Sequence, residues 1–270
     1  MIAGKTWREI RLMALAYLLI LELLCVPVLL WWPDIYPELQ RSPLLRNLGI
    51  SFARPIGQGI SSDDQDAAYR SWVALMLFLR SGNLGGIAAA VLFGTGLFAR
   101  ERENQTFEWL LARPVGRGAI LWQKVWPTAL CIVVPMFVVN ASAFWWSSLI
   151  GEQLPTYPML LATTHAALFA LAMLLLTTWV SALLRVQAHV AAVVGAFAIV
   201  QLGLYLTQRI RPYTLFKLVD FDWYGPILAG NIKAWQMFDP VHAVGYTSWL
   251  LVACVVFYGL ALRALQRVEP

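Results

Sequence analysis

Residues 157–184, YPMLLATTHAALFALAMLLLTTWVSALL, contain no Asp, Glu, Lys or Arg over 28 consecutive positions. A helix needs about 20 predominantly apolar residues to cross the hydrocarbon core of a bilayer. This stretch is long enough to do so without a break. It therefore predicts a membrane-spanning helix.

Five further apolar runs of spanning length flank this one, at about 12–31, 75–99, 125–147, 189–207 and 247–262. The chain of 270 residues is 60% apolar and 13% charged, with a mean hydropathy of +0.65. Soluble domains average about 25% charged residues, and disordered chains combine low hydrophobicity with high charge. The composition thus excludes both classes. It predicts one all-α polytopic membrane domain over residues 1–270, with six transmembrane helices.

The cysteines and the first apolar run are consistent with this prediction. Cys25, Cys131 and Cys254 all lie inside apolar runs, where a free thiol behaves as a small apolar side chain. They therefore do not suggest an extracytoplasmic disulfide framework. The first run is too long for the apolar part of a cleavable signal peptide, so we expect it to remain in the membrane.

Lys and Arg residues are distributed unequally between the two sides of the membrane. Six spans place both termini on one side, which carries eleven cations and five acids. The other side carries eight cations and nine acids, most of them in the long connections 32–74 and 208–246. By the positive-inside rule, both termini are predicted to be cytoplasmic. The net charge of +5 is modest and does not suggest a nucleic-acid partner.

The N-terminal segment, residues 5–11, mixes three cations with Trp7 and Ile10. A short helix of this composition suits the boundary between lipid headgroups and acyl chains. We therefore predict an amphipathic helix that lies on the inner membrane surface before the first span.

The connection between the second and third spans, residues 99–117, reads ARERENQTFEWLLARPVGR. At helical spacing, Phe107, Leu110 and Leu111 form one apolar stripe, and Asn104 is placed to cap the start of the helix. The predicted helix has about two turns and would be marginal alone in water, so its stripe must rest on another surface. Lipid headgroups and a groove on a cytoplasmic partner are both open interpretations.

Residues 101–117 resemble the first cytoplasmic loop of permease subunits of type-2 ATP-binding-cassette (ABC) exporters. In that family this loop carries a coupling helix, which sits in a cleft of a separately encoded ATPase subunit. The residues to which the resemblance assigns ATPase coupling are Glu101, Glu103, Thr106, Phe107, Glu108, Leu110, Leu111, Arg113, Pro114 and Arg117.

The resemblance also implies how this chain would work. Two permeases, either two copies or a copy and a paralogue, would form the translocation path in a bilayer, with a bacterial inner membrane as the expected location. ATP and Mg²⁺ would bind to the partner ATPase subunits. This chain would bind no cofactor and would not be an enzyme by itself.

Glu22 lies near the middle of the first span, where an ionised side chain costs on the order of 3 kcal/mol. One interpretation is a contact with the substrate or with a proton in the translocation path. The other is a structural acid, protonated or hydrogen-bonded, with Arg80 or His165 as a partner. An ion-gradient-driven secondary transporter that uses Glu22 is the alternative function, although no inverted repeat supports it.

Other chemistry-bearing residues do not form a recognisable site. His165, His189 and His242 lack the spacing of a tight metal site, so we expect no bound metal. The acidic run Asp63-Asp64-Gln65-Asp66 is expected to be a solvated face. No motif of a serine hydrolase or zinc protease is present, which argues against an intramembrane enzyme.

The outer segment at residues 213–239 is too apolar for a free loop. We predict short interfacial or re-entrant helices there, before the sixth span, because irregular backbone at membrane depth needs protein or water partners. A lid over the exit path and simple packing against the span ends are both compatible with the sequence.

Overall fold

The computed structural model describes residues 2–41, 64–112, 114–239 and 246–267. Every element in these ranges is helical, and six helices are long and apolar enough to cross a membrane. The predicted class, an all-α polytopic protein with six spans, is therefore confirmed. Asp63, Arg113 and His242 lie outside the described residues.

The spans are longer than most of the predicted ranges. Their bounds are Ile2–Leu30 (α1), Gln65–Glu103, Arg117–Leu149 (α9), Thr156–Leu183 (α10), Gln187–Tyr205 (α11) and Tyr246–Gln266 (α14). The first three extend furthest beyond the ranges that hydropathy predicted. A hydropathy profile reports only the apolar part of a helix, whereas backbone hydrogen bonding continues into the polar layers on either side.

The second span is assembled from four consecutive pieces, α5 (Gln65–Val73), η1 (Ala74–Leu84), α6 (Gly85–Thr95) and α7 (Ala99–Glu103). The η1 piece is a π-helix, and it contains the polar interruption at residues 80–83 that the sequence shows. The Ser81 hydroxyl donates a hydrogen bond to the Met76 carbonyl, five residues earlier, at 3.1 Å. Wide turns of this kind are frequent at functional sites.

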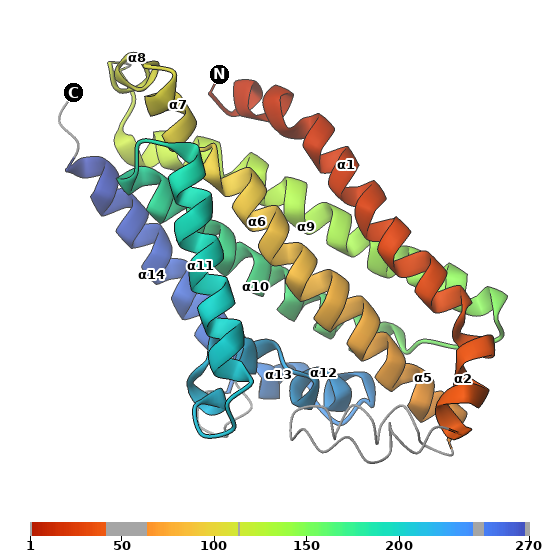
Figure 1. Cartoon of the computed structure of the whole chain (residues 1–270). Helices are drawn as coiled ribbons and strands as arrows, with labels where there is room; N and C mark the ends of the chain where they lie inside the picture. The colour runs from red at the N-terminus through yellow and green to blue at the C-terminus, as the bar shows by residue number, and fades with distance from the viewer. Residues whose placement is uncertain (1, 42–63, 113, 240–245, 268–270) are drawn as a thin grey trace.

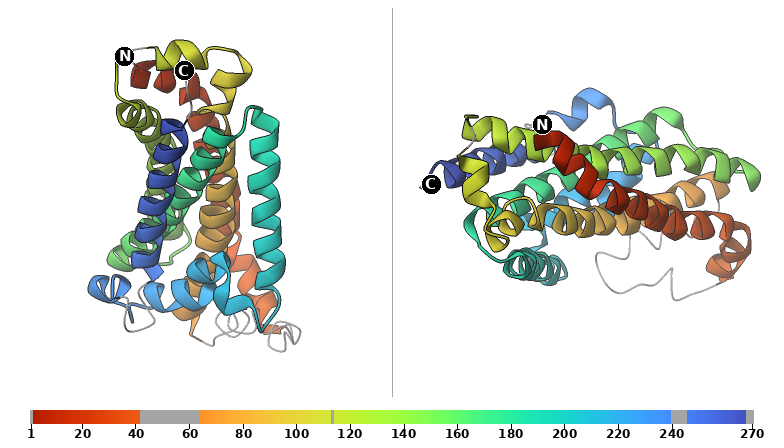
Figure 2. Two further views of the ribbon diagram at one scale, coloured as in Figure 1. Left: turned by 90° about the vertical axis from the view of Figure 1, so that its left-hand side faces the viewer. Right: turned by 90° about the horizontal axis from the view of Figure 1, so that it is seen from above.

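The α10 helix forms the centre of the bundle and packs against α6, α9, α11 and α14. Within its most apolar window 78% of the residues are buried, against 17% for α11, which lies along the edge of the bundle in both views of Figure 2. A Cβ added to Gly94 on α6 would lie 2.8 Å from the Thr177 side chain on α10, so a glycine permits this close approach. The exposed apolar face of α11 faces lipid or another protein.

Both termini lie at one end of the bundle, beside α7 and α8 (Phe107–Leu111), as Figure 1 shows. The opposite end carries α2 (Trp32–Arg41), α12 (Phe221–Leu228) and α13 (Ala234–Met237). Six spans thus bring the two ends of the chain together, as predicted. We call the end with the termini the terminal end and the other the outer end.

The predicted surface helix at residues 5–11 is not a separate element. These residues form early turns of α1, which runs uninterrupted from Ile2 to Leu30. Lys5 contacts Glu9 at 3.7 Å on its own helix and Glu101 at 3.2 Å on α7. Because no helix breaker separates the amphipathic segment from the apolar one, backbone hydrogen bonding passes straight through the junction.

Short helices do occupy the outer segment, where η2 (Arg211–Tyr213) and η3 (Leu215–Val219) precede α12 and α13. Asn83 of the second span and His165 of the fourth hold this segment through polar side chains. The amide of Asn83 donates to the Val219 carbonyl at 2.9 Å, and Nε2 of His165 lies 2.8 Å from the Leu218 carbonyl. The remaining nitrogen of His165, Nδ1, lies 2.9 Å from the Thr247 hydroxyl on α14.

Charged side chains brace the same segment. Arg211 and Lys217 both contact the carboxylates of Asp220 and Asp222. Burial alone would lower the pKa of Lys217, but the hydrogen bond to Asp222 and the charge of Asp220 raise it above its ordinary value. This cluster keeps η3 and the start of α12 close together.

Candidate partner-docking site

The predicted helix in the connection after span two is shorter than expected. The α8 helix has five residues, Phe107–Leu111, and Thr106, not Asn104, precedes it. The chain turns at residues 104–105 because the Thr106 amide donates to the Glu101 carbonyl at 2.8 Å, and Gln105 adopts a φ of 57°. The local backbone therefore ends α7 before α8 begins.

Glu101 is the centre of a buried ionic network beneath α8. Its Oε1 atom lies 3.1 Å from Nζ of Lys124 on α9 and 3.2 Å from Nζ of Lys5 on α1. The Thr106 hydroxyl donates to the second carboxylate oxygen, and Nζ of Lys124 also donates to the Leu97 carbonyl at 2.7 Å. Lys124 is 5% exposed, whereas Lys5 is exposed. This network links α7 and α8 to the first and third spans.

A second set of contacts links the same region to α10 and α11. The Ser181 hydroxyl of α10 accepts hydrogen bonds from the amides of Phe98 and Ala99, at 3.1 and 3.0 Å. The guanidinium of Arg102 donates to the Leu184 carbonyl at 3.2 Å. The Glu103 carboxylate accepts from the amide of Gln187, the first residue of α11, at 3.4 Å.

Arg117 connects the region to the sixth span. Its guanidinium donates to the carbonyls of Leu265 and Gln266, the latter at 3.3 Å, at the C-terminal end of α14. Carbonyls in the last turn of a helix have no partner within the helix, and a cation there also complements the helix dipole. Arg117 therefore supports the fold in addition to any role in coupling.

Phe107 and Leu110, two of the three residues of the apolar stripe, do not face outward. Phe107 and Leu110 are 6% and 8% exposed, and the Phe107 ring packs edge-on against Phe98 with Arg102 stacked over it at 4.7 Å. The expectation that these two side chains would reach into a groove on a partner is corrected here, because the chain's own bundle buries them. Pro114 is exposed. The side chain of Leu111, like the whole of Arg113, lies outside the described residues.

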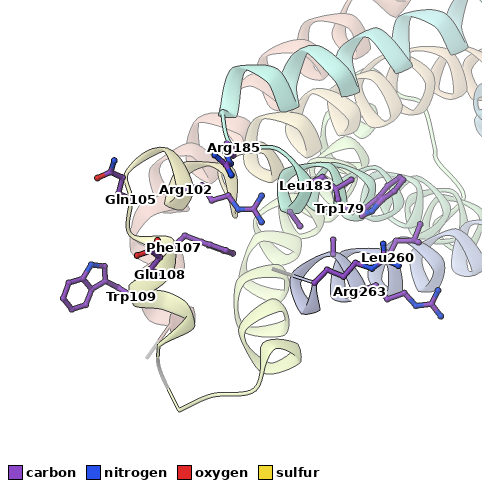
Figure 3. Close-up of a pocket in the computed structure, with 13 residues that line it drawn as sticks. Arg102, Gln105, Phe107, Glu108, Trp109, Trp179, Leu183, Arg185, Leu260 and Arg263 are labelled. Atoms are coloured by element: carbon purple, nitrogen blue, oxygen red, sulfur yellow. The ribbon is translucent and has the colours of Figure 1, made fainter. Parts of the chain in front are cut away.

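Gln105, in the turn before α8, together with Glu108 and Trp109 on α8, forms an outward surface that we call the α8 outer face. All three are exposed, and Trp109 is 79% exposed. Figure 3 shows Trp109 and Gln105 directed away from the bundle and Phe107 directed toward it. The family resemblance includes Glu108 among the coupling residues but neither Gln105 nor Trp109. The helical spacing that put Phe107 and Leu110 on one face also put Trp109 on another, so an exposed indole was foreseeable.

Two clefts flank this face, and Trp109 lines both of them. The larger cleft, of about 1160 Å³, lies between α8 and the C-terminal ends of α10 and α14. The smaller, of about 510 Å³, lies between α8 and the first turns of α1, with Glu101 and Lys124 in its wall. A large exposed aromatic side chain between two concave surfaces has the character of a binding hot spot.

Glu22 has a structural partner in the membrane. The Ser142 hydroxyl of α9 donates a hydrogen bond to Oε2 of Glu22 at 3.1 Å. The suggested partners Arg80 and His165 do not fill this role, since His165 binds Leu218 and Thr247 instead. The interpretation of Glu22 as a hydrogen-bonded structural acid is thus supported, with Ser142 as its partner. A contact of Glu22 with the substrate stays a prediction.

Among the described residues no three His, Cys, Asp or Glu side chains are grouped in a way that could hold a metal ion. Both nitrogens of the buried His165 ring have protein partners. Asp64 caps α5 by accepting from the Asp66 amide at 3.1 Å, so part of the acidic run has a structural role.

One comparison with known families gave a match. The sequence model of a family described as ABC-2 family transporter protein matches residues 54–208, more than half of the chain. The matched range includes the second to fifth spans, the Glu101–Lys124 ion pair and the α8 outer face. A comparison with curated proteins gave no match.

Proposed function

The chain belongs to the ABC-2 transporter family, and from this premise we propose that it is the membrane-spanning half of an ATP-driven exporter. Membership makes it a multi-pass permease of an ABC transport system, a class that pairs with ABC ATPase subunits. In our proposal two permeases form the translocation path, and separate ATPase chains bind ATP and Mg²⁺. The chain itself then catalyses no reaction, and its termini lie in the cytoplasm of a bacterial cell.

The observation that carries the proposal is the α8 outer face. A five-residue helix has little stability alone, yet this one is held by buried contacts on its inner side while Trp109 is left 79% exposed. Such a rigid, aromatic projection suits the groove of a folded partner. We infer that the ATPase subunit binds the α8 outer face and that the predicted stripe of Phe107 and Leu110 seats the helix on the permease.

The contacts beneath α8 suggest how ATPase motion reaches the spans. Glu101 links the region to α1 and α9, Ser181 to α10, Glu103 to α11, and Arg117 to α14. A displacement of α8 is therefore transmitted to every span it is tied to, since packed helices move as rigid bodies.

Replacing Trp109 with Ser is expected to reduce co-purification of the ATPase subunit about 30-fold or more. Truncation of an interface hot spot typically costs at least about 2 kcal/mol. The fold should be unaffected because the side chain is exposed. The measurement is the amount of ATPase retained on the tagged permease, extracted from its native membrane in mild detergent and quantified by mass spectrometry.

Trp122→Ser is the matched control, since Trp122 is also exposed, at 58%, and lies near the terminal end on α9. It should retain the ATPase at the level of the unmodified chain. Equal loss of the ATPase from both variants would mean that tryptophan removal disturbs how the permease sits in the membrane. It would not then indicate a contact between Trp109 and the ATPase. No ATPase on the unmodified chain under any condition would contradict the proposal and favour a gradient-driven transporter.

Glu22→Gln separates the two transport mechanisms. The amide oxygen of Gln still accepts the hydrogen bond of Ser142, so we expect ATP hydrolysis by the reconstituted complex to stay within about twofold of the unmodified rate. If the carboxyl of Glu22 carries protons during transport, Glu22→Gln abolishes that role, because a Gln amide does not titrate. Loss of substrate-stimulated hydrolysis would place Glu22 in the substrate path, and transport that depends on a proton gradient alone would support the alternative.

A further inference from the structure

The larger cleft beside α8, of about 1160 Å³, is lined by four arginines, Arg102, Arg185, Arg263 and Arg267. Among the described residues that line it, Glu108 is the one acid. Arg185 lies close enough to Arg102 for their charges to repel each other. Four cations that share one concave surface are stabilised by an anion between them, and guanidinium groups bind phosphate with two parallel hydrogen bonds.

Apart from Gln105, the rest of the lining is apolar, with Phe107 and Trp109 contributed by α8 and the other residues by two spans. Trp179 and Leu183 come from the last turns of α10, and Leu260 and Ala264 come from α14. Figure 3 shows Trp179 and Leu183 between Arg102 and Arg185 on one side and Leu260 with Arg263 on the other. The cleft thus offers a charged rim beside an apolar wall that continues along two membrane-spanning helices.

We propose that this cleft binds the phosphate of an anionic phospholipid, with the arginines around the headgroup and the start of an acyl chain against Trp179, Leu183 and Leu260. Basic pockets between transmembrane helices are known to hold anionic lipid headgroups. A free phosphate would use the rim and leave the apolar wall without a partner. An acidic loop of an ATPase subunit would also leave the apolar wall without a partner. A charged rim beside an apolar wall therefore favours a lipid, which has both a phosphate and an acyl chain.

The site has a consequence for the transporter. The lipid lies between α8, α10 and α14, so its phosphate bridges α7, which carries Arg102, and the end of the sixth span, which carries Arg263. Gln105, Glu108 and Trp109 of the α8 outer face also line the cleft, but lipid binding is measurable without an ATPase partner, because every residue that lines the cleft belongs to this chain. It can therefore fail or hold independently of the proposed function.

The test uses the purified full chain without any ATPase, in a neutral detergent. Dioctanoyl phosphatidylglycerol, dioctanoyl phosphatidylcholine and inorganic phosphate are titrated separately, and bound molecules are counted by native mass spectrometry. The variant is Arg185→Gln with Arg263→Gln, since both side chains are exposed. The matched control is Arg11→Gln with Arg100→Gln, which removes two exposed cations near the same end but outside the cleft.

We expect saturable binding of phosphatidylglycerol that is about 25-fold weaker in the Arg185/Arg263 variant, at about fivefold for each cation, and within twofold of unmodified in the control. Phosphatidylcholine and inorganic phosphate should not compete. If the Gln variant does not fold, Arg185→Lys with Arg263→Lys keeps the charges but loses paired hydrogen bonding. It should weaken binding severalfold.

Equal weakening in both pairs of variants would overturn the proposal, because binding would then follow total charge and not the cleft. Inorganic phosphate that competes at similar concentration would assign the rim to a free anion. Absence of saturable phosphatidylglycerol binding to the unmodified chain would also refute the proposal.

Discussion

Lys124→Met is expected to lower the free energy of unfolding by about 3 to 5 kcal/mol, because it removes one partner of a buried ion pair and leaves the other charged. Nζ of Lys124 is 3.1 Å from Oε1 of Glu101 and 2.7 Å from the Leu97 carbonyl, and its side chain is 7% exposed. Met has similar length and no charge. Unfolding is followed in a mixed-micelle titration with sodium dodecyl sulfate.

Lys5→Met provides an internal comparison, since Lys5 contacts the same carboxylate oxygen at 3.2 Å but with a side chain that is 58% exposed. Its loss should cost less than about 1 kcal/mol, because solvent screens an exposed pair. The double variant of Glu101→Gln with Lys124→Met should recover at least about 1 kcal/mol of the loss, since no unpaired charge stays buried. Equal effects of Lys5→Met and Lys124→Met would refute the assignment of Lys124 as the principal partner.

His165→Leu is expected to destabilise the attachment of the outer segment by about 2 to 4 kcal/mol. The Leu218 carbonyl can only accept, so Nε2 of His165 carries the hydrogen and donates to it at 2.8 Å. Nδ1 then accepts from the Thr247 hydroxyl, 2.9 Å away. Leucine leaves two buried polar groups without partners, at about 1 to 3 kcal/mol each. Hydrogen exchange of residues 215–228 measures the local effect.

Thr178→Val is the matched control on the same helix. Thr178 is fully buried like His165, but its hydroxyl donates only to the Leu174 carbonyl of α10 itself, at 2.7 Å. It should change protection of residues 215–228 by less than about twofold. Unchanged protection in His165→Leu would show that Asn83 and the charged cluster hold the segment without the histidine, which contradicts the proposed attachment.

The candidate site was only partly predictable from sequence. The resemblance singled out residues 101–117, and these lie inside the range that the family model matches. The sequence did not predict whether each of these side chains faces the bundle or points away from it. A helical spacing rule places Phe107 and Leu110 on a common face, but it does not say whether that face meets a partner or the chain's own Phe98 and Arg102.

The second feature that the sequence did not predict is the pairing of residues that lie far apart along the chain. Glu101 is separated by 96 residues from Lys5 and by 23 from Lys124, and His165 by 82 from Thr247. No local pattern encodes such a pairing, because a titratable residue in an apolar run has several equally distant candidates. For Glu22 the sequence suggested Arg80 or His165, and the packing of α1 on α9 supplied Ser142 instead.

The sequence by itself determined that this chain crosses a membrane six times, with its two ends together. The reason is that about 20 consecutive apolar residues are stable in a bilayer as a helix, regardless of what they pack against. Only the tertiary structure decided which face of α8 is free, which carboxylate joins α1 to α9, and which arginines share a cleft. Those outcomes depend on how the helices pack, since contact between distant residues exists only once the bundle has formed.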